Sequence, residues 1–191
     1  MAASLAPSLL LSMPQLLDPN FNRTVVLLCN HNELGAFGLV VNRPLITAGR
    51  VVVNVDRATA ERTGASSEEM VREDLEVWVG GPVEPERSWI LVGRDEPDQG
   101  VRVADGLYLS TSPDLVRRLL EPDPPPNARL MVGYSGWGPG QLEAELHASA
   151  WLIGEVERDL IFDTPADRMW ETAIRRLGAD PDMLQMGRGV H

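Results

Sequence analysis

Short apolar runs separated by turn residues fill the first part of the chain and predict β-strands. Ser8–Ser12 is one such run, and Thr24–Cys29 is continuously apolar and β-branched at its start, as in strands covered on both faces. Asp18–Asn22 between them combines Asx and Pro residues, which favour a turn. The apolar pattern resumes at Phe37–Val41 after residues 30–35, so Thr24–Cys29 and Phe37–Val41 are predicted to form a hairpin.

Two further strand pairs are predicted in the middle of the chain. Leu75–Val79 and Ser88–Val92 flank a turn rich in Gly and Pro, and we predict that they pair with each other. Val101–Val103 and Leu107–Leu109 flank the dipeptide Asp105-Gly106, which is typical of a type I′ hairpin turn.

Helices are predicted in the second half from the residues at their starts. A Ser, Thr or Gly before Pro supplies an N-cap and a first helical position that needs no backbone donor. The three predicted starts are Ser112-Pro113, Gly138-Pro139 and Thr164-Pro165, with ends near Glu121 for the first and Leu177 for the third. Between the last two helices, Ala150–Ile153 and Leu160–Phe162 have the apolar character of strands.

Hairpins early in the chain and helices later favour an α+β fold with a mainly antiparallel sheet over a doubly wound parallel one. Residues 46–74 are ambiguous, because Ile46–Val55 fits a helix or a strand and Thr63–Glu69 fits a loop or a helix start. With 191 residues and 43% apolar content the chain can bury an ordinary core, and we expect residues 1–191 to form a single domain.

The segment Gly133–Leu146 has the strongest character of a site. Glycines surround Trp137 between a predicted strand and a predicted helix. Gln141, three residues after the predicted N-cap Gly138, can reach back to a free backbone donor, and Gly140 leaves the first-turn N–H groups uncovered. Such a helix start attracts anions. Alternatively, the glycines only allow a strand-to-helix corner to pack tightly beside the indole.

Three known motifs fail here on identifiable residues. A dinucleotide fingerprint needs glycine where Gln141 stands, and a nucleophile elbow around Ser135 needs glycine where Trp137 stands. A P-loop needs Lys, whereas all 17 basic residues are Arg. No catalytic set is assembled elsewhere, so the sequence does not name a reaction, and we expect no cofactor.

Composition restricts the partners and the compartment. A net charge of −11 without a basic stripe disfavours direct contact with nucleic acid or an anionic membrane. The stretch Leu5–Leu17 is interrupted by Pro7 and Pro14 and lacks the basic residues of a signal peptide. No run approaches the roughly 20 apolar residues of a membrane helix. The single cysteine, Cys29, fits a reducing environment, so we expect a soluble cytoplasmic protein.

Four segments in order along the chain carry a resemblance to a known family. They are Asp18–Leu28, Gly35–Leu45, Gly80–Val83 and Gly133–Glu143. Together they resemble the AlgH/YqgE family over nearly the whole chain. The resemblance implies an α+β fold whose bifurcated sheet is rolled into a pseudo-barrel with flanking helices. It implies little about function, because the family consists of uncharacterised bacterial proteins with a loose transcriptional-regulator label. One departure is Ser149 before Ala150-Trp151, where the family usually has Asn.

The charged end of one central strand completes the site hypothesis. Asn42-Arg43 is predicted to face the glycine-rich turn across a polar concavity with Trp137 at its rim, where a carboxylate or phosphate would bind. Alternatively, Arg43 pairs with a nearby acidic residue. The residues predicted to contact the ligand are Asn42, Arg43, Gly136, Trp137, Gly138, Gly140 and Gln141.

The remaining chemistry is limited to a few side chains. Cys29 and His31 are two residues apart and would share a strand face, which suggests a thiolate assisted by imidazole; alternatively the thiol is an inert apolar group. With only three His we expect no metal site. The sequence therefore favours a non-enzymatic regulatory protein that binds an unknown protein or a small anion. The alternative is an enzyme or redox sensor that uses Cys29 or Ser135.

The charge balance predicts that the protein does not bind duplex DNA at physiological salt. A specific binder neutralises several phosphates with clustered Lys and Arg, and this chain has 28 acidic against 17 basic residues. Titration of labelled duplex at ~150 mM salt measures this. Tight binding with a steep salt dependence would contradict the prediction.

Overall fold

The computed structural model describes residues 4–16, 18–45, 51–53, 70–72, 75–94, 97 and 100–186. Its strands are β1 (Ser8–Ser12), β2 (Val25–Asn32), β3 (Gly35–Val40), β4 (Val51–Val53), β5 (Met70–Arg72), β6 (Val77–Val79), β7 (Val83–Val92), β8 (Gly100–Ala104), β9 (Leu107–Ser110), β10 (Ala128–Trp137) and β11 (Trp151–Gly154). Its helices are α2 (Pro113–Leu119), α3 (Gln141–His147), α4 (Arg158–Phe162), α5 (Ala166–Arg176) and α6 (Pro181–Met186). None of these described helices is long and apolar enough to span a membrane.

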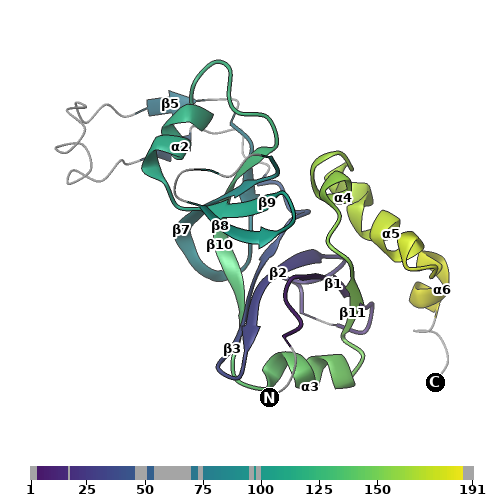
Figure 1. The fold of residues 1–191 in the computed structure, drawn as a ribbon. Helices are drawn as coiled ribbons and strands as arrows, with labels where there is room; N and C mark the ends of the chain where they lie inside the picture. The colour runs from purple at the N-terminus through teal and green to yellow at the C-terminus, as the bar shows by residue number, and fades with distance from the viewer. Residues whose placement is uncertain are drawn as a thin grey trace.

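The main sheet is curled and mainly antiparallel, in the order β11-β1-β2-β3-β10-β7-β9-β8, and β4 pairs with β5 apart from it. Strand β10 runs through both halves of the molecule (Figure 1). Its end, Ser135–Trp137, pairs with β3, whereas its earlier part pairs antiparallel with β7 and parallel with β6. The expected α+β class with a mainly antiparallel, rolled-up sheet and flanking helices is confirmed, and the sheet forms a curled half-barrel.

A close crossing of two backbone segments lets β10 pair with β3 at one end and with β6 and β7 at the other. The register of β10 shifts between Val132 and Tyr134, where Gly133 has φ +70°. At this point the chain after β6 passes over β10 so closely that a Cβ on Gly133 would lie 2.4 Å from the carbonyl oxygen of Gly81. A Cβ on Gly81 would lie 2.3 Å from the Tyr134 backbone. Only glycine fits either position.

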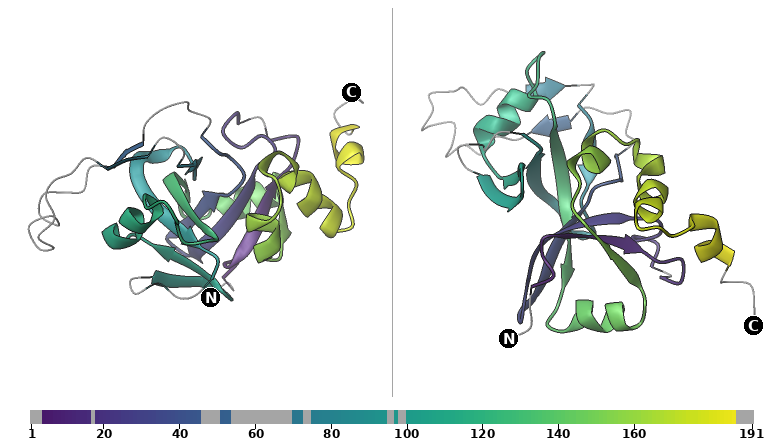
Figure 2. Two further views of the ribbon diagram at one scale, coloured as in Figure 1. Left: turned by 90° about the horizontal axis from the view of Figure 1, so that it is seen from above. Right: turned by 45° about the vertical axis from the view of Figure 1, so that its right-hand side comes forward.

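Apolar side chains cover both faces of the β1–β3 region. Leu9 and Leu11 of β1 join the cluster under α5, and Leu10 joins the opposite cluster under α3, because successive strand residues point to opposite faces. Figure 2 shows α5 alongside one side of these strands and α3 at the end of β10. A third cluster lies beneath α2. This two-sided burial explains the continuous apolar runs of β1 and β2.

Several sequence-based predictions hold. β2 pairs with β3 as a hairpin, and Asp18 Oδ1 accepts a hydrogen bond from the Asn20 N–H in the expected Asx turn. The hydroxyl of Ser112 caps α2 by accepting from the Leu115 N–H. Helix α5 ends close to the predicted position, with Gly178 at φ +79° after it.

The predicted pairing of Leu75–Val79 with Ser88–Val92 is wrong. β6 and β7 both pair with β10, which lies between them, because the Gly80-Gly81 crossing carries the chain from one side of β10 to the other. The signal of a Gly- and Pro-rich turn was real. It marked a crossing and not a hairpin.

Other local predictions need correction. β8 and β9 form the expected hairpin, but only Gly106 of its two turn residues has positive φ, so the turn is not type I′. Leu160–Phe162 lies in the short helix α4, where Leu160 and Ile161 are buried. An apolar run this short fits either structure, and packing decides it. Within residues 46–74, Val51–Val53 and Met70–Arg72 are strands, and Thr63–Glu69 lies outside the described residues.

The crossing predicts unequal costs for two glycines with the same φ. Gly133 (φ +70°) is crowded by backbone, whereas Gly140 (φ +72°) has nothing within 4 Å of an added Cβ. Gly140→Ala is expected to lower the free energy of unfolding by about 1 kcal/mol, the cost of left-handed backbone alone. Gly133→Ala is expected to cost at least ~3 kcal/mol more, because the clash displaces the crossing chain. Urea unfolding followed by Trp fluorescence compares them. Equal losses would show that the contact is not essential.

Candidate functional site

The glycine-rich turn proves to be an internally bonded corner. The N-cap of α3 is Gly140 and not the predicted Gly138, so the seven-residue helix begins at Gln141. The predicted reach of Gln141 is confirmed: its Oε1 accepts from the Gly138 N–H at 3.0 Å. Gly136 lies within β10 opposite Phe37. The turn therefore satisfies one backbone donor internally, as predicted, whereas the N-cap Gly140 gives α3 no side-chain cap.

Trp137 is buried, with 6% of its surface exposed, and is not at a rim. Its indole packs with the rings of Phe21 and Trp151. Oε2 of Glu145, on α3, accepts from the indole N–H groups of Trp137 (2.9 Å) and Trp151 (2.7 Å). Oε1 of the same carboxylate accepts from Gln141. Sequence reasoning missed Glu145, whose three partners lie on β10, α3 and β11.

Strand pairing separates Asn42-Arg43 from the Trp137 end of β10 along β3. Trp137 pairs with Ala36 at the start of β3, whereas Asn42 and Arg43 follow the end of β3. Because β3 and β10 are antiparallel neighbours, the last residues of β10 lie beside the first residues of β3 and away from its last residues.

The polar groups of Asn42 and Arg43 are committed to the loop before β2. Asn42 accepts from the Val25 N–H and donates to the Arg23 carbonyl. The Arg43 guanidinium donates to the carbonyls of Pro19 and Asn22, and desolvation lowers its pKa. Both side chains thus hold the loop of residues 18–23.

The expectation that Cys29 and His31 share a strand face is wrong. A β-bulge between Leu28 and Asn30 inserts one extra residue, and an odd insertion reverses the facing of the residues after it. Cys29 packs against the cluster under α5, and His31 bonds to Glu143 on α3. Burial raises the pKa of the Cys29 thiol to about 12.

Ser135 has no exposed surface, and its hydroxyl donates to the Gly80 carbonyl at 3.1 Å. The hydroxyl is thereby committed to the crossing beneath Gly80-Gly81. Within the described part of the chain, no group of three or more His, Cys, Asp or Glu side chains is placed to hold a metal ion.

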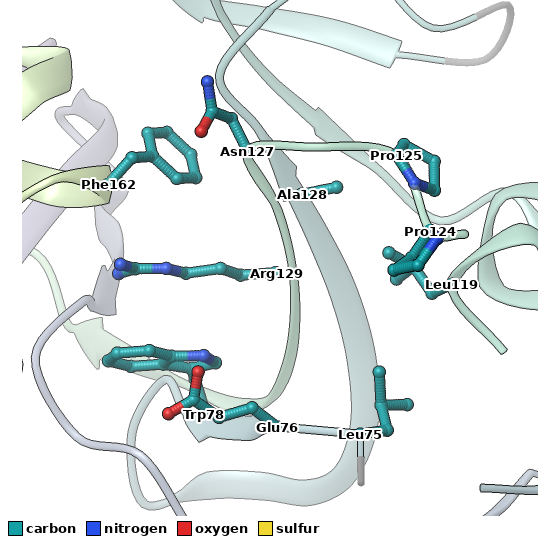
Figure 3. A pocket seen from close by; sticks show the side chains of 10 residues that line it. All are labelled: Leu75, Glu76, Trp78, Leu119, Pro124, Pro125, Asn127, Ala128, Arg129 and Phe162. Atoms are coloured by element: carbon teal, nitrogen blue, oxygen red, sulfur yellow. The ribbon is translucent and has the colours of Figure 1, made fainter. Parts of the chain in front are cut away.

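A different polar group stands in a cleft. Arg129 of β10 lines a pocket of about 310 Å³, to which β6, α2 and α4 also contribute residues. Its guanidinium carbon lies 3.9 Å from the ring centre of Trp78 and 5.1 Å from that of Phe162 (Figure 3). One Nη donates to the Val41 carbonyl at 3.2 Å. The flat cation is thus held between two aromatic rings by cation–π contacts.

Two carboxylates act on the charge of Arg129, and one of them, Glu76, lines the same pocket. Desolvation lowers the pKa of Arg129 to about 10, so it stays protonated at neutral pH. The carboxylates of Glu76 and Asp163 act in the opposite direction, yet within the described residues neither lies within ion-pair distance of the guanidinium. A protonated guanidinium with unused edge donors in a cleft can bind a carboxylate or a phosphate.

Apolar side chains form much of the remaining wall of the Arg129 cleft. Besides Arg129 and its two rings, the cleft is lined by the apolar residues Leu75, Leu119, Pro124, Pro125 and Ala128 and by the polar residues Glu76 and Asn127. Sequence reasoning missed this site, because Trp78, Arg129 and Phe162 come from β6, β10 and α4, and only the fold brings them together. The one signal was a charged residue directly before an apolar run.

These features define a curled α+β half-barrel protein with a preformed arginine cleft. The chain belongs to the AlgH-like family (DUF179), whose model matches residues 9–182. It is 41% identical to a UPF0301 protein of Myxococcus xanthus over 188 residues, covering 98% of this chain and 99% of that one. It is 44% identical to a UPF0301 protein of Anaeromyxobacter dehalogenans over 191 residues, covering 98% and 95%. This is an uncharacterised bacterial family.

Two solved structures share the fold. The solution structure of AlgH from Pseudomonas aeruginosa matches with a TM-score of 0.70 and 30% identity, over 100% of this chain and 97% of that one. A crystal structure of a Corynebacterium diphtheriae protein matches with a TM-score of 0.62 and 21% identity, over 97% and 92%, and shows the fold alone.

The raised pKa predicts slow alkylation of Cys29. Relative to a free thiol of pKa ~8.5, a thiol of pKa about 12 has ~10³-fold less thiolate at neutral pH. Iodoacetamide labelling of native protein should therefore be far slower than that of glutathione, and its rate should rise up to about pH 12. The urea-unfolded protein, reacting like a free thiol, is the control. If the native protein were labelled faster than glutathione, the result would support the redox-sensor alternative.

Proposed function

We propose that this chain is a non-enzymatic regulatory protein of the cytoplasm that binds a small anionic molecule, and that Arg129 is the anchor. The observation that carries the proposal is the guanidinium held between Trp78 and Phe162 at the wall of a cleft. A cation fixed in this way loses little side-chain entropy when an anion binds. In the glycine-rich turn, which the sequence favoured for this role, the Gly138 N–H and the Trp137 indole are engaged internally.

The cleft also indicates the shape of the anion. Both faces of the guanidinium are covered by rings, so a ligand can reach only its edge, which suits the two oxygens of a carboxylate or a phosphate. The wall formed by Leu75, Leu119 and the two prolines suits an apolar part of the same molecule. A carboxylate or phosphate on a small apolar body fits both features.

The enzymatic alternative has less support. The two nucleophiles are unfavourably placed: Ser135 is buried and bonded to the Gly80 carbonyl, and burial raises the pKa of the half-buried Cys29 thiol to about 12. Regulation through a bound anion or a protein partner also agrees with an acidic chain better than direct contact with DNA does.

Thermal unfolding with benzoate, acetate and phosphate tests the proposal, with sodium chloride at matched ionic strength as the reference. An anion at ten times its Kd should stabilise the protein by about 1.4 kcal/mol, a rise in Tm of roughly 3–6 °C. Arg129→Met should abolish the rise, because it keeps the apolar stem and removes the charge. Benzoate should act at lower concentration than acetate.

Arg43→Ala and Gly140→Val are the matched controls, since they alter the region that the sequence favoured and leave the cleft intact. Both variants should keep the rise in Tm. If they lose it while Arg129→Met retains it, the anion binds at the glycine-rich turn. If no anion stabilises the wild type, Arg129 has only a structural role and links β10 to β6.

A further inference from the structure

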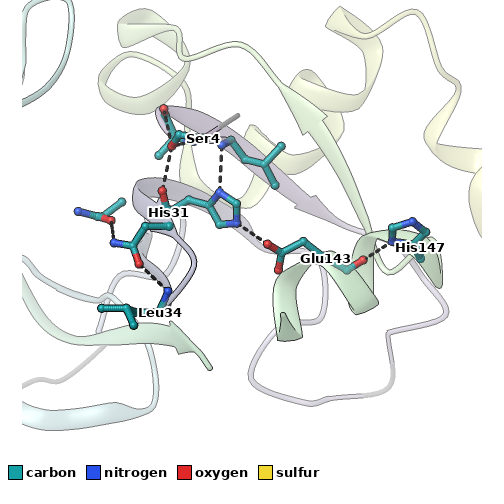
Figure 4. A network of polar contacts seen from close by, with 9 residues as sticks. Ser4, His31, Leu34, Glu143 and His147 are labelled. Atoms are coloured by element: carbon teal, nitrogen blue, oxygen red, sulfur yellow. Dashed lines mark hydrogen bonds and ion pairs between the residues drawn. The ribbon is translucent and has the colours of Figure 1, made fainter. Parts of the chain in front are cut away.

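A buried histidine ties the N-terminal segment to the barrel. The side chain of His31, near the end of β2, is 5% exposed. Its Nδ1 accepts a hydrogen bond from the Leu5 N–H at 3.1 Å, and its Nε2 lies 2.9 Å from Oε1 of Glu143 on α3 (Figure 4). The Ser4 hydroxyl donates to the His31 carbonyl at 3.1 Å. Segment, strand and helix thus meet at one imidazole ring.

The partners of the ring determine where its proton lies. A backbone N–H can only donate, so Nδ1 must offer its lone pair to Leu5. The proton of the neutral ring is therefore on Nε2, from which it is donated to the Glu143 carboxylate. A second proton can go only to Nδ1, where it would face the Leu5 N–H and replace an attraction by a repulsion.

We propose that His31 is an acid-sensitive latch: protonation at Nδ1 releases the segment Ser4–Pro7 from β2. The open state binds one more proton than the latched state, so lower pH favours opening by linkage. Histidine is the side chain that ordinarily changes its charge between about pH 5 and 8, and this is the range that the test covers.

The charged groups around the ring support proton uptake. Glu143 faces Nε2 from α3, and a backbone hydrogen bond together with His31 holds the pKa of this carboxyl below its usual range. Its negative charge stabilises an imidazolium. His147, one turn further along α3, bonds the Glu143 carbonyl. The segment Ser4–Pro7 brings no titratable side chain, and the partner of His31 on β3 is Ala36. The cost of protonation therefore falls on the Leu5 contact.

Opening would uncover an apolar surface. Leu5 and Ala6 pack against the cluster that contains Leu10, Leu142 and Trp151. Release of the segment would remove this cover and leave part of the cluster beside α3 accessible to a partner. The cleft at Arg129 lies elsewhere, so the latch is independent of the proposed anion site.

Two-dimensional NMR of the whole chain tests the latch. Ring nitrogen shifts of His31 should show the Nε2–H form at pH 7.5 and the doubly protonated form by pH 5. Over the same range the exchange protection of the Leu5 amide, corrected for intrinsic rate, should fall about tenfold or more. The Leu11 amide in β1 should keep its protection, which separates local release from unfolding.

Two substitutions separate the roles of the ring nitrogens. His31→Asn places an uncharged acceptor near the position of Nδ1, so the Leu5 amide should stay protected at both pH values. His31→Gln can reach Glu143 but offers Leu5 no such acceptor, so the segment should be loose at both. His147→Asn, which keeps both ring contacts of His31, is the control, and in it the Leu5 amide should lose protection over the same pH range as in the wild type. A protonated His31 with an unchanged Leu5 amide, or a ring that stays neutral to pH 5, would overturn the proposal.

Discussion

The close crossing of two backbones at Gly81 and Gly133 is the contact on which the rest of the structure depends. Around it, the Gly80 N–H donates to the Val132 carbonyl, and the Gly80 carbonyl accepts from the Val40 N–H and the Ser135 hydroxyl. The crossing therefore links β3, β6 and β10 by backbone bonds. A side chain at either glycine would separate them. Two of the segments that carry the family resemblance meet here, which gives their glycines a physical reason.

Because β10 passes through this crossing, its two ends serve different purposes. Its end at Trp137 builds the corner in which Glu145 binds two indoles. Its beginning carries Arg129, whose guanidinium lies in the cleft against the ring of Trp78 from β6 and the ring of Phe162 from α4. The corner engages both indoles and the Gly138 N–H internally, whereas in the cleft the guanidinium has one hydrogen bond to the residues that the structure describes, to the Val41 carbonyl. This contrast is why the ligand proposal rests on the cleft.

Local chemistry was a reliable guide wherever one segment sufficed. The Asx turn at Asp18, the cap at Ser112 and the reach of Gln141 involve residues no more than three positions apart, so the sequence contains all of their partners. Ser149 adopts φ +55°, a conformation that Asn tolerates better than Ser. The start of α3 was misjudged by two residues, because Gly140 and not Gly138 makes the cap.

The sequence by itself determined the α+β class, most strands, the family and the absence of the familiar catalytic motifs, because apolar periodicity and turn chemistry act over a few residues. Tertiary structure decided which segments meet. A single bulge placed Cys29 and His31 on opposite faces. Antiparallel pairing put Trp137 beside the start of β3, whereas Arg43 follows its end. Trp78, Arg129 and Phe162 converge only because β10 crosses between the halves. Contacts between distant segments depend on register and topology, which no local pattern encodes.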